Sequence, residues 1–337
     1  MFNEKQIGLG AIVKSKDYSK EQKKDMLKAK MSKFIFGTRE KKGIVAQAAI
    51  YLLLICIGFV YLYPMIYMFI TSMMSLEDLL DTSSKWIPSG FYIKNYADAF
   101  KVMKFTDTFM DSLFIALVPS LCQVVVCSLA GYGFARFNFK GKKVLMGIMI
   151  LTFVIPPQIT MMPTYLLYSD LGLIGSVKAL IYPALLGQGF KSAIFILIYY
   201  QFYKQIPTSL IEAAQIDGAG QIKTYFLIAI RSAIPAIIVV FLFSFVWYWN
   251  ETYLTGLYLG NSGMGAKNTM STLLLELKQF EASYTKMYPV TENSPDKLNE
   301  AIKMAGTIIA TAPLLILGFV LQRHITESVD TSGITGE

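Results

Sequence analysis

Six stretches of this sequence are long and apolar enough to cross a lipid bilayer, which takes about 20 mainly apolar residues in a helix. Hydrophobic residues make up 54% of the chain and charged residues 16%, a balance that suits lipid better than water. Helices are expected because hydrocarbon offers no partner to unpaired backbone groups, and the alternating pattern of a membrane β-barrel is missing from the sequence. The chain is therefore predicted to be an all-α membrane protein with six transmembrane helices. The predicted spans are Val45–Thr71, Thr108–Phe134, Val144–Leu167, Val177–Phe202, Ser232–Leu257 and Ala301–Leu321.

Two of these spans contain residues that interrupt helices. Three prolines fall in the third span, and Pro183, Gly187 and Gly189 fall in the fourth. A proline within a membrane helix frees a carbonyl, which must find a neighbour or water. The pattern predicts either ordinary kinks or breaks that line a pathway.

The basic residues predict how the chain is oriented. In the connections and tails, 20 Lys and Arg residues lie on the side that holds both termini, and eight lie on the other side. Cytoplasmic loops carry the excess of Lys and Arg in membrane proteins. We therefore expect a basic cytoplasmic tail over 1–43, a six-span domain over 44–325 and a cytoplasmic tail over 326–337. The first tail runs straight into an apolar span, which favours a membrane-adjacent segment over a nucleic-acid-binding arm.

No pattern typical of an enzyme or a metal site occurs in the sequence. The Gly-x-x-x-x-Gly-Lys-Ser/Thr phosphate loop is missing, so the chain is not expected to bind ATP itself. His324 is the single histidine, so a multi-histidine metal site is excluded, and its place at a span end beside Arg323 argues against a His-based triad. Cys56, Cys122 and Cys127 all lie in apolar stretches, which argues against disulfides and metal ligation. We predict no catalytic residue, no metal ligand and no cofactor in this chain.

Polar side chains within the predicted spans are candidate functional residues, because placing them in lipid is costly. Lys191 falls near the centre of the fourth span, and Trp247, Asn250 and Glu251 lie in the fifth. These residues could line a translocation pathway, with the ring of Trp247 stacking on a hydroxyl-rich solute. Structural roles are equally open: aromatic residues often form an interfacial belt, and Lys191 could pair with Glu251 or with a carbonyl freed by Pro183.

The cytoplasmic connection between the fourth and fifth spans, residues 204–230, is predicted to form two short helices around a turn. Ser209 and Glu212, preceded by Pro207, match a capping box. Gly218, after Asp217, predicts a sharp turn in which a left-handed backbone is natural for glycine. The first helix is half apolar and needs a cover, either from its own bundle or from a partner's groove. The residues alone leave both alternatives open.

This connection resembles the Glu-Ala-Ala motif of ABC-importer permeases, which continues with three residues, Gly and an apolar segment that ends in Pro. The matching residues are Glu212, Ala213, Ala214, Asp217, Gly218, Ala219, Phe226 and Pro235. Further resemblance extends over about residues 45–325 and is to the maltose-type carbohydrate permeases. It is carried by Ala130–Arg136, Pro156-Pro157, Met162–Tyr165, Leu171–Ser176, Trp249-Asn250 and Leu321–Arg323. The sequence departs from the family at Arg231, where a proline is usual, so the resemblance does not predict the geometry between the loop and the fifth span.

The resemblance implies the type I importer permease fold, in which this loop is a cytoplasmic coupling helix that fits a cleft of an ATPase subunit. It further implies a non-catalytic permease subunit of an ATP-driven, binding-protein-dependent importer of sugars, and of oligosaccharides in particular, in the bacterial plasma membrane. The implied partners are a second permease, two ATPase subunits that bind ATP and Mg²⁺, and an extracytoplasmic sugar-binding protein, with no nucleic acid. Two alternatives are a secondary transporter, for which we would expect an internal repeat, and an ABC permease for a non-sugar solute.

Overall fold

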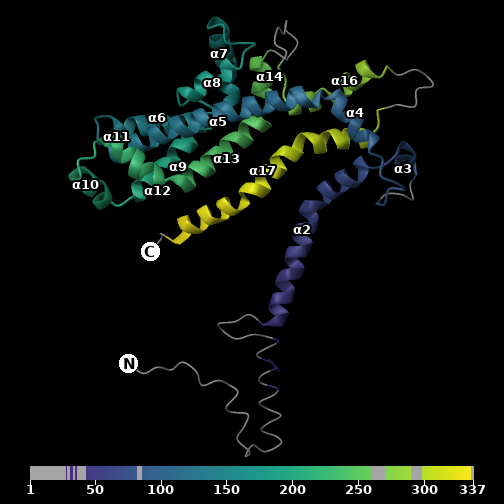
Figure 1. The fold of residues 1–337 in the computed structure, drawn as a ribbon, viewed down its shortest axis with the longest axis horizontal. Coiled ribbons are helices and arrows are strands. Elements are labelled where there is room, and N and C mark those ends of the chain that lie inside the picture. The colour runs from purple at the N-terminus through teal and green to yellow at the C-terminus, as the bar shows by residue number, and fades with distance from the viewer. Residues whose placement is uncertain are drawn as a thin grey trace, which may run out of the picture. The chain divides into compact units, whose positions relative to one another are not determined.

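The computed structural model describes residues 43–81, 86–259, 270–289 and 298–334, together with Lys28, Met31, Ser32 and Ile35, and it describes side chains as far as residue 322. The regular secondary structure of these residues is helical, with no β-strand among them (Figure 1). The all-α prediction is therefore confirmed. The chain divides into two units, Met1–Tyr67 and Met68–Glu337.

The first unit contains most of helix α2 (Ile44–Ser72), which has 29 residues. No side chain in its most apolar 18-residue window is buried within the structure. A helix that is apolar all round and exposed cannot be stable in water, so it requires lipid or another protein around it. This helix corresponds to the first predicted span.

The second unit is a bundle built on α5 (Phe105–Arg136), a helix of 32 residues. Helices α8, α9 and α13 pack along α5, and α17 packs against α13 and α4. The other helices are α3 (Leu76–Leu80), α4 (Lys94–Val102), α6 (Lys142–Val154), α7 (Pro157–Asp170), α8 (Lys178–Leu185), α9 (Ser192–Gln205), α10 (Thr208–Ile216), α11 (Gln221–Thr224), the π-helix η2 (Tyr225–Ala229), α12 (Ile230–Ser232), α13 (Ile234–Asn250), α14 (Tyr253–Leu259), α15 (Leu273–Lys278), α16 (Phe280–Met287) and α17 (Glu300–Ile334).

Helices α5 and α9 pack closely against each other at Gly131. A Cβ atom added to Gly131 would lie 2.5 Å from the Cβ of Tyr199 and 3.0 Å from the carbonyl oxygen of Ile196. Small residues allow the backbones of membrane helices to approach one another in this way. Glycine at 131 is therefore required by the contact with α9.

Fewer than six helices span the required length without interruption. Among the described residues, three helices pass as continuous spans: α2, α5 and the Glu300–Gln322 part of α17. Two bent helix pairs would each add a span if counted as one: α6 with α7 at 100°, which is the third predicted span, and Gln221–Ser232 with α13 at 75°. In the second pair only α13 belongs to the predicted fifth span, because Gln221–Ser232 lies almost wholly in the predicted connection before it. Proline explains the first bend, because Pro156 and Pro157 lie where α6 gives way to α7.

The fourth predicted span is broken into two helices. Helix α8 ends at Leu185 and α9 begins at Ser192. Between them the backbone is left-handed at Gly187, with φ +72°, and at Lys191, with φ +60°. Of the two alternatives for this span, a kink or a break, the structure has a break.

Candidate functional site

The connection between the fourth and fifth spans forms the predicted helix and turn. Helix α10 lies at one end of the bundle with α11, and α4 and α16 lie at the opposite end (Figure 1). None of the residues of α10 is buried, and Leu210 and Ile216 are 50% and 86% exposed. Beyond the turn, Ile222 is 76% exposed. The loop is therefore not covered by its own bundle, which leaves an apolar face for a partner.

The predicted capping box at the start of α10 is wrong. Helix α10 begins at Thr208, and Pro207 occupies the N-cap position without a side-chain cap hydrogen bond. Ser209 consequently lies inside the first turn, whereas a capping side chain must belong to the residue that precedes the helix. Glu212 is exposed on α10 and does not reach back to the helix start.

The turn after α10 is built from backbone hydrogen bonds. The N–H of Ala219 donates to the carbonyl of Ala214 at 2.8 Å, and the N–H of Gly218 donates to that of Gln215 at 3.0 Å. This pair of bonds is the Schellman motif, which requires a left-handed residue directly after the helix. Gly218 supplies it with φ +78°. A Cβ atom at Gly218 would meet nothing within 4 Å, so the requirement lies in the backbone angle and not in space.

The six predicted coupling residues therefore occupy one short element. Four of them lie within the segment that the Schellman motif closes: Ala214, Asp217, Gly218 and Ala219. A further hydrogen bond runs from the N–H of Asp217 to the carbonyl of Ala213 at 3.0 Å. Among them, Ala214 and Ala219 are half-buried, and the others are exposed. The arrangement presents small side chains next to a sharp turn, so another surface can approach the backbone closely.

Both ends of this element are tied to α5. Before it, Arg136 at the end of α5 donates a hydrogen bond to the carbonyl of Ile206. The Ser128 hydroxyl is hydrogen-bonded to that of Tyr203 at 2.5 Å and to that of Tyr225 at 2.8 Å. Tyr203 lies in the last turn of α9, and Tyr225 begins η2. These contacts fix the two ends of the loop to the same helix.

The departure from the family at Arg231 does not prevent a bend. Arg231 is exposed in α12, and the chain turns at Ala233, with φ −94° and ψ 9°. Helix α13 then begins at Ile234, with Pro235 in its first turn, where a proline leaves no hydrogen bond unmade. The bend of 75° before α13 is therefore formed without a proline at 231.

The break in the fourth span brings Lys191 next to aromatic rings. The Lys191 Nζ lies 5.7 Å from the ring centroid of Phe153 and 5.9 Å from that of Trp247. The Lys191 side chain is exposed, and both distances are within cation–π range. The structure thus brings two of the four predicted pathway residues, Lys191 and Trp247, together.

The other two predicted pathway residues lie at the end of α13. Asn250 is its last residue and is exposed. One carboxylate oxygen of Glu251 accepts hydrogen bonds from the N–H groups of Tyr253 and Leu254, each at 2.9 Å, and so caps the start of α14. The alternative that Lys191 pairs with Glu251 is not seen among the described residues, where the Glu251 carboxylate caps α14 and the Lys191 Nζ lies beside Phe153 and Trp247.

A buried glutamine that the sequence did not single out holds the break in place. The Gln123 Nε2 donates to the carbonyl of Phe190 at 2.9 Å and to the Ser192 hydroxyl at 2.7 Å. Its Oε1 accepts from the Ser244 hydroxyl at 2.5 Å. Irregular backbone at membrane depth is tolerated where protein groups satisfy it. A lone glutamine in an apolar span was the signal that could have identified this residue.

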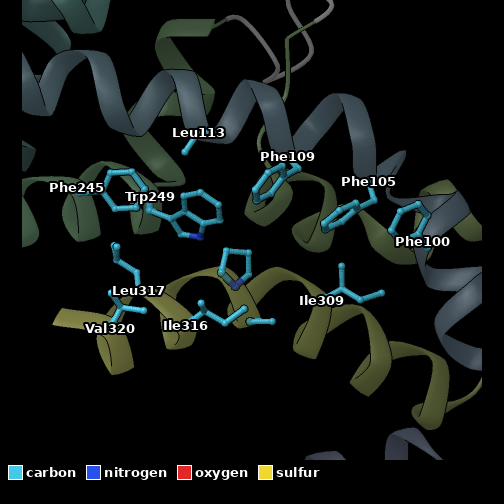
Figure 2. A pocket seen from close by; sticks show the side chains of 12 residues that line it. Phe100, Phe105, Phe109, Leu113, Phe245, Trp249, Ile309, Ile316, Leu317 and Val320 are labelled. Carbon is cyan, nitrogen blue, oxygen red and sulfur yellow. The ribbon is translucent and has the colours of Figure 1, made fainter. Parts of the chain in front are cut away.

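An apolar groove of about 580 Å³ opens between α5, α13 and α17. Figure 2 shows the rings of Phe105 and Phe109 from α5 and of Trp249 from α13 directed toward Ile309 and Ile316 of α17. Sites for small polar solutes contain a few well-placed polar groups, and the lining of this groove is apolar apart from the indole N–H. The groove therefore does not have the chemistry of a sugar site.

Comparison with known proteins identifies the family. Residues 124–331 match the binding-protein-dependent transport system inner membrane component family. The chain belongs to this family. The permease is 29% identical over 297 residues to the polygalacturonan/rhamnogalacturonan transport system permease protein YtcP of Bacillus subtilis (strain 168), covering 88% of this chain and 100% of YtcP. It is 29% identical over 299 residues to the osmoprotective compounds uptake permease protein GgtD of Synechocystis sp. (strain ATCC 27184 / PCC 6803 / Kazusa), covering 87% of this chain and 94% of GgtD.

The fold of the permease is also that of a solved transporter. It matches a chain of a bacterial ABC transporter involved in the import of the acidic polysaccharide alginate with a TM-score of 0.66, over 92% of this chain and 99% of that chain, at 18% identity. The predicted ABC-importer permease fold is confirmed, and the permease is a multi-pass membrane protein of a transport system. The family match includes the whole connection over 204–230, the break at Lys191 and the end of α13.

Proposed function

We propose that the permease is the transmembrane subunit of an ATP-driven, binding-protein-dependent importer of sugars, and of oligosaccharides in particular. The observation that carries the proposal is the exposed α10 with its Schellman turn at Gly218, in a chain of this transport family. The names of YtcP and of the alginate transporter support a carbohydrate as the solute. A non-sugar solute is the second candidate, because the name of GgtD gives its solutes as osmoprotective compounds and does not restrict them to sugars.

The proposed mechanism couples ATP hydrolysis in partner subunits to alternating access. The exposed apolar residues of α10 dock in a groove of an ATPase subunit, as amphipathic helices do in other complexes. Closure of two ATPase subunits around ATP and Mg²⁺ moves the loop, and this permease rocks against a second permease. An extracytoplasmic binding protein delivers the sugar. Both termini face the cytoplasm of a bacterium in this arrangement.

The proposed solute route passes the break between α8 and α9. Lys191, exposed beside Trp247, offers a cation and an aromatic face at membrane depth. A charge there is costly unless it faces protein or water, which supports a position on the route. Asn250 and Glu251 extend the proposed lining at the end of α13.

Reconstitution in proteoliposomes tests this function. The permease, copurified with its second permease and ATPase, should take up an oligosaccharide only when ATP is inside and the binding protein outside. Mass spectrometry of the ligand carried by the copurified binding protein should identify the solute. Uptake that needs neither ATP nor the binding protein would contradict the proposal, and a non-sugar ligand would select the second candidate.

A further inference from the structure

The coupling loop is joined to the rest of the permease by contacts at its two ends, and α10 between them has no buried residue. Those contacts converge on α5. The Ser128 hydroxyl bonds to Tyr203 just before the loop and to Tyr225 just after it, across 75 and 97 residues of sequence. All three side chains are buried, with exposures of 3%, 0% and 6%.

The packing around this hydroxyl group couples it to the backbone of α5. Gly131, three residues further along α5, allows α9 to approach so closely that a methyl group would clash with Tyr199. The ring of Tyr132 lies 5.3 Å from that of Tyr203 and 4.9 Å from that of Tyr225. Helix α9, η2 and this part of α5 are thus packed together, so a displacement of the loop is expected to displace α5.

The same helix makes polar contacts at its opposite end. The Asp111 carboxylate accepts the N–H of Ser271 at 3.2 Å, and the Ser112 hydroxyl accepts the N–H of Leu273 at 2.8 Å. These partners lie at the start of α15, in the connection that the basic residues predict to be extracytoplasmic. A helix of 32 residues therefore joins the loop to the far side of the bundle.

We propose that Ser128 is a positioning residue for coupling: through Tyr203 and Tyr225 it fastens both ends of the coupling loop to α5, which carries the movement across the membrane. This proposal rests on the proposed function. It assigns the coupling to the two hydrogen bonds that the Ser128 hydroxyl shares with Tyr203 and Tyr225. Loss of these bonds should lower the amount of sugar transported per ATP hydrolysed without releasing the ATPase subunit. Arg136 provides a second tether before the loop and is expected to be less important, because it holds only one end.

The test compares variants in the reconstituted complex, with sugar taken up per ATP hydrolysed as the readout. Ser128→Ala removes both bonds, and the double variant Tyr203→Phe/Tyr225→Phe removes them while keeping all three side chains nearly the same size. The matched control is Tyr199→Phe, since the Tyr199 hydroxyl is buried next to Tyr203 and has no hydrogen-bond partner among the residues that the structure describes. Retention of the ATPase subunit and the thermal stability of each complex are measured in parallel.

We expect the uptake per ATP to fall about fivefold or more in Ser128→Ala and in the double variant, where fivefold is the lower end of typical coupling between two sites. The uptake per ATP should be unchanged in Tyr199→Phe. Normal coupling in the double variant would overturn the proposal. So would an equal loss in Tyr199→Phe, or loss of assembly in the double variant, because the hydroxyls would then be structural only. If wild type shows no ATP-dependent uptake, the proposed function fails instead.

Discussion

At the residue scale, the two glycines that flank Ala219, Gly218 and Gly220, differ in backbone conformation but not in the space around them. Gly218 has φ +78°, whereas Gly220 has φ −68° and ψ 169°, angles that any residue adopts. A Cβ atom would meet nothing within 4 Å at either position. Within this chain, only the backbone angle distinguishes the two sites.

Gly218→Val is expected to uncouple the permease. The substitution strains the left-handed turn, by about 1 kcal/mol or more, and a branched side chain keeps the loop away from a close partner. Transport and binding-protein-stimulated ATP hydrolysis should fall together in proteoliposomes while the permease still inserts. Gly220→Ala is the control and should behave as wild type. Undiminished uptake with normal ATPase stimulation in Gly218→Val would show that the loop is not the coupling element.

Lys191→Met tests the proposed solute route. If Lys191 lines the route, this variant should alter the uptake rate while assembly and ATPase binding stay intact, and Lys191→Arg, which keeps the charge, should be affected less. Exposed cation–π contacts contribute about 0.5–1 kcal/mol, so the thermal stability should change little. A drop in expression or stability with normal uptake kinetics would assign Lys191 a structural role beside Phe153 and Trp247.

At the scale of elements, the contact between α5 and α9 is the most demanding in the bundle. Gly131 and Gly133 lie on the same helix, but only Gly131 has a neighbour within 4 Å of an added Cβ atom. Gly131→Ala should destabilise the permease by about 1–3 kcal/mol through overpacking. Gly133→Ala should be neutral or stabilise it by up to about 1 kcal/mol, because alanine is the better helix former. Thermal unfolding in detergent measures both, and equal melting temperatures would contradict this packing.

Also at this scale, whether a predicted span forms a continuous, a bent or a broken helix depends on the residues that interrupt it. Pro156 and Pro157 produce a bend of 100° between α6 and α7, yet Pro163 lies inside α7 without ending it. The sequence shows where the prolines lie but not which of them bends its helix. The effect of a proline depends on whether neighbouring groups can form hydrogen bonds with the backbone groups that it leaves unpaired. In the fourth span, Gln123 supplies the bonds that allow the backbone to leave the helix.

At the scale of the whole molecule, the orientation in the membrane is a prediction from the unequal division of Lys and Arg residues. A cysteine-free permease, with Cys56, Cys122 and Cys127 replaced, allows this to be tested by single cysteines. An impermeant maleimide added to intact cells should label Lys286→Cys, exposed in α16, but not Gln215→Cys, exposed in α10. Labelling of Gln215→Cys from outside would contradict the predicted orientation. Labelling of both after cell lysis is the control.

The sequence by itself determined the properties that depend on short stretches of chain. The apolar lengths of the spans are local, and so is the turn at Gly218, because a left-handed residue after a helix is a backbone preference that glycine meets wherever it lies. The resemblance in the coupling loop likewise rests on consecutive residues. Even here the prediction of the cap at Ser209 was wrong, since Pro207 is the N-cap and the helix begins at Thr208, two residues earlier than a cap at Ser209 would place it.

Only the tertiary structure decided which residues meet across the bundle. Gln123 bonds to Phe190 and Ser244, 67 and 121 residues away, and Ser128 chooses Tyr203 and Tyr225 from 20 tyrosines in the chain. Buried hydroxyls and amides must find partners wherever the packing places them. That packing depends on close helix contacts such as the one at Gly131, which hydropathy and spacing do not encode, and it is what connects the coupling loop to the rest of the permease.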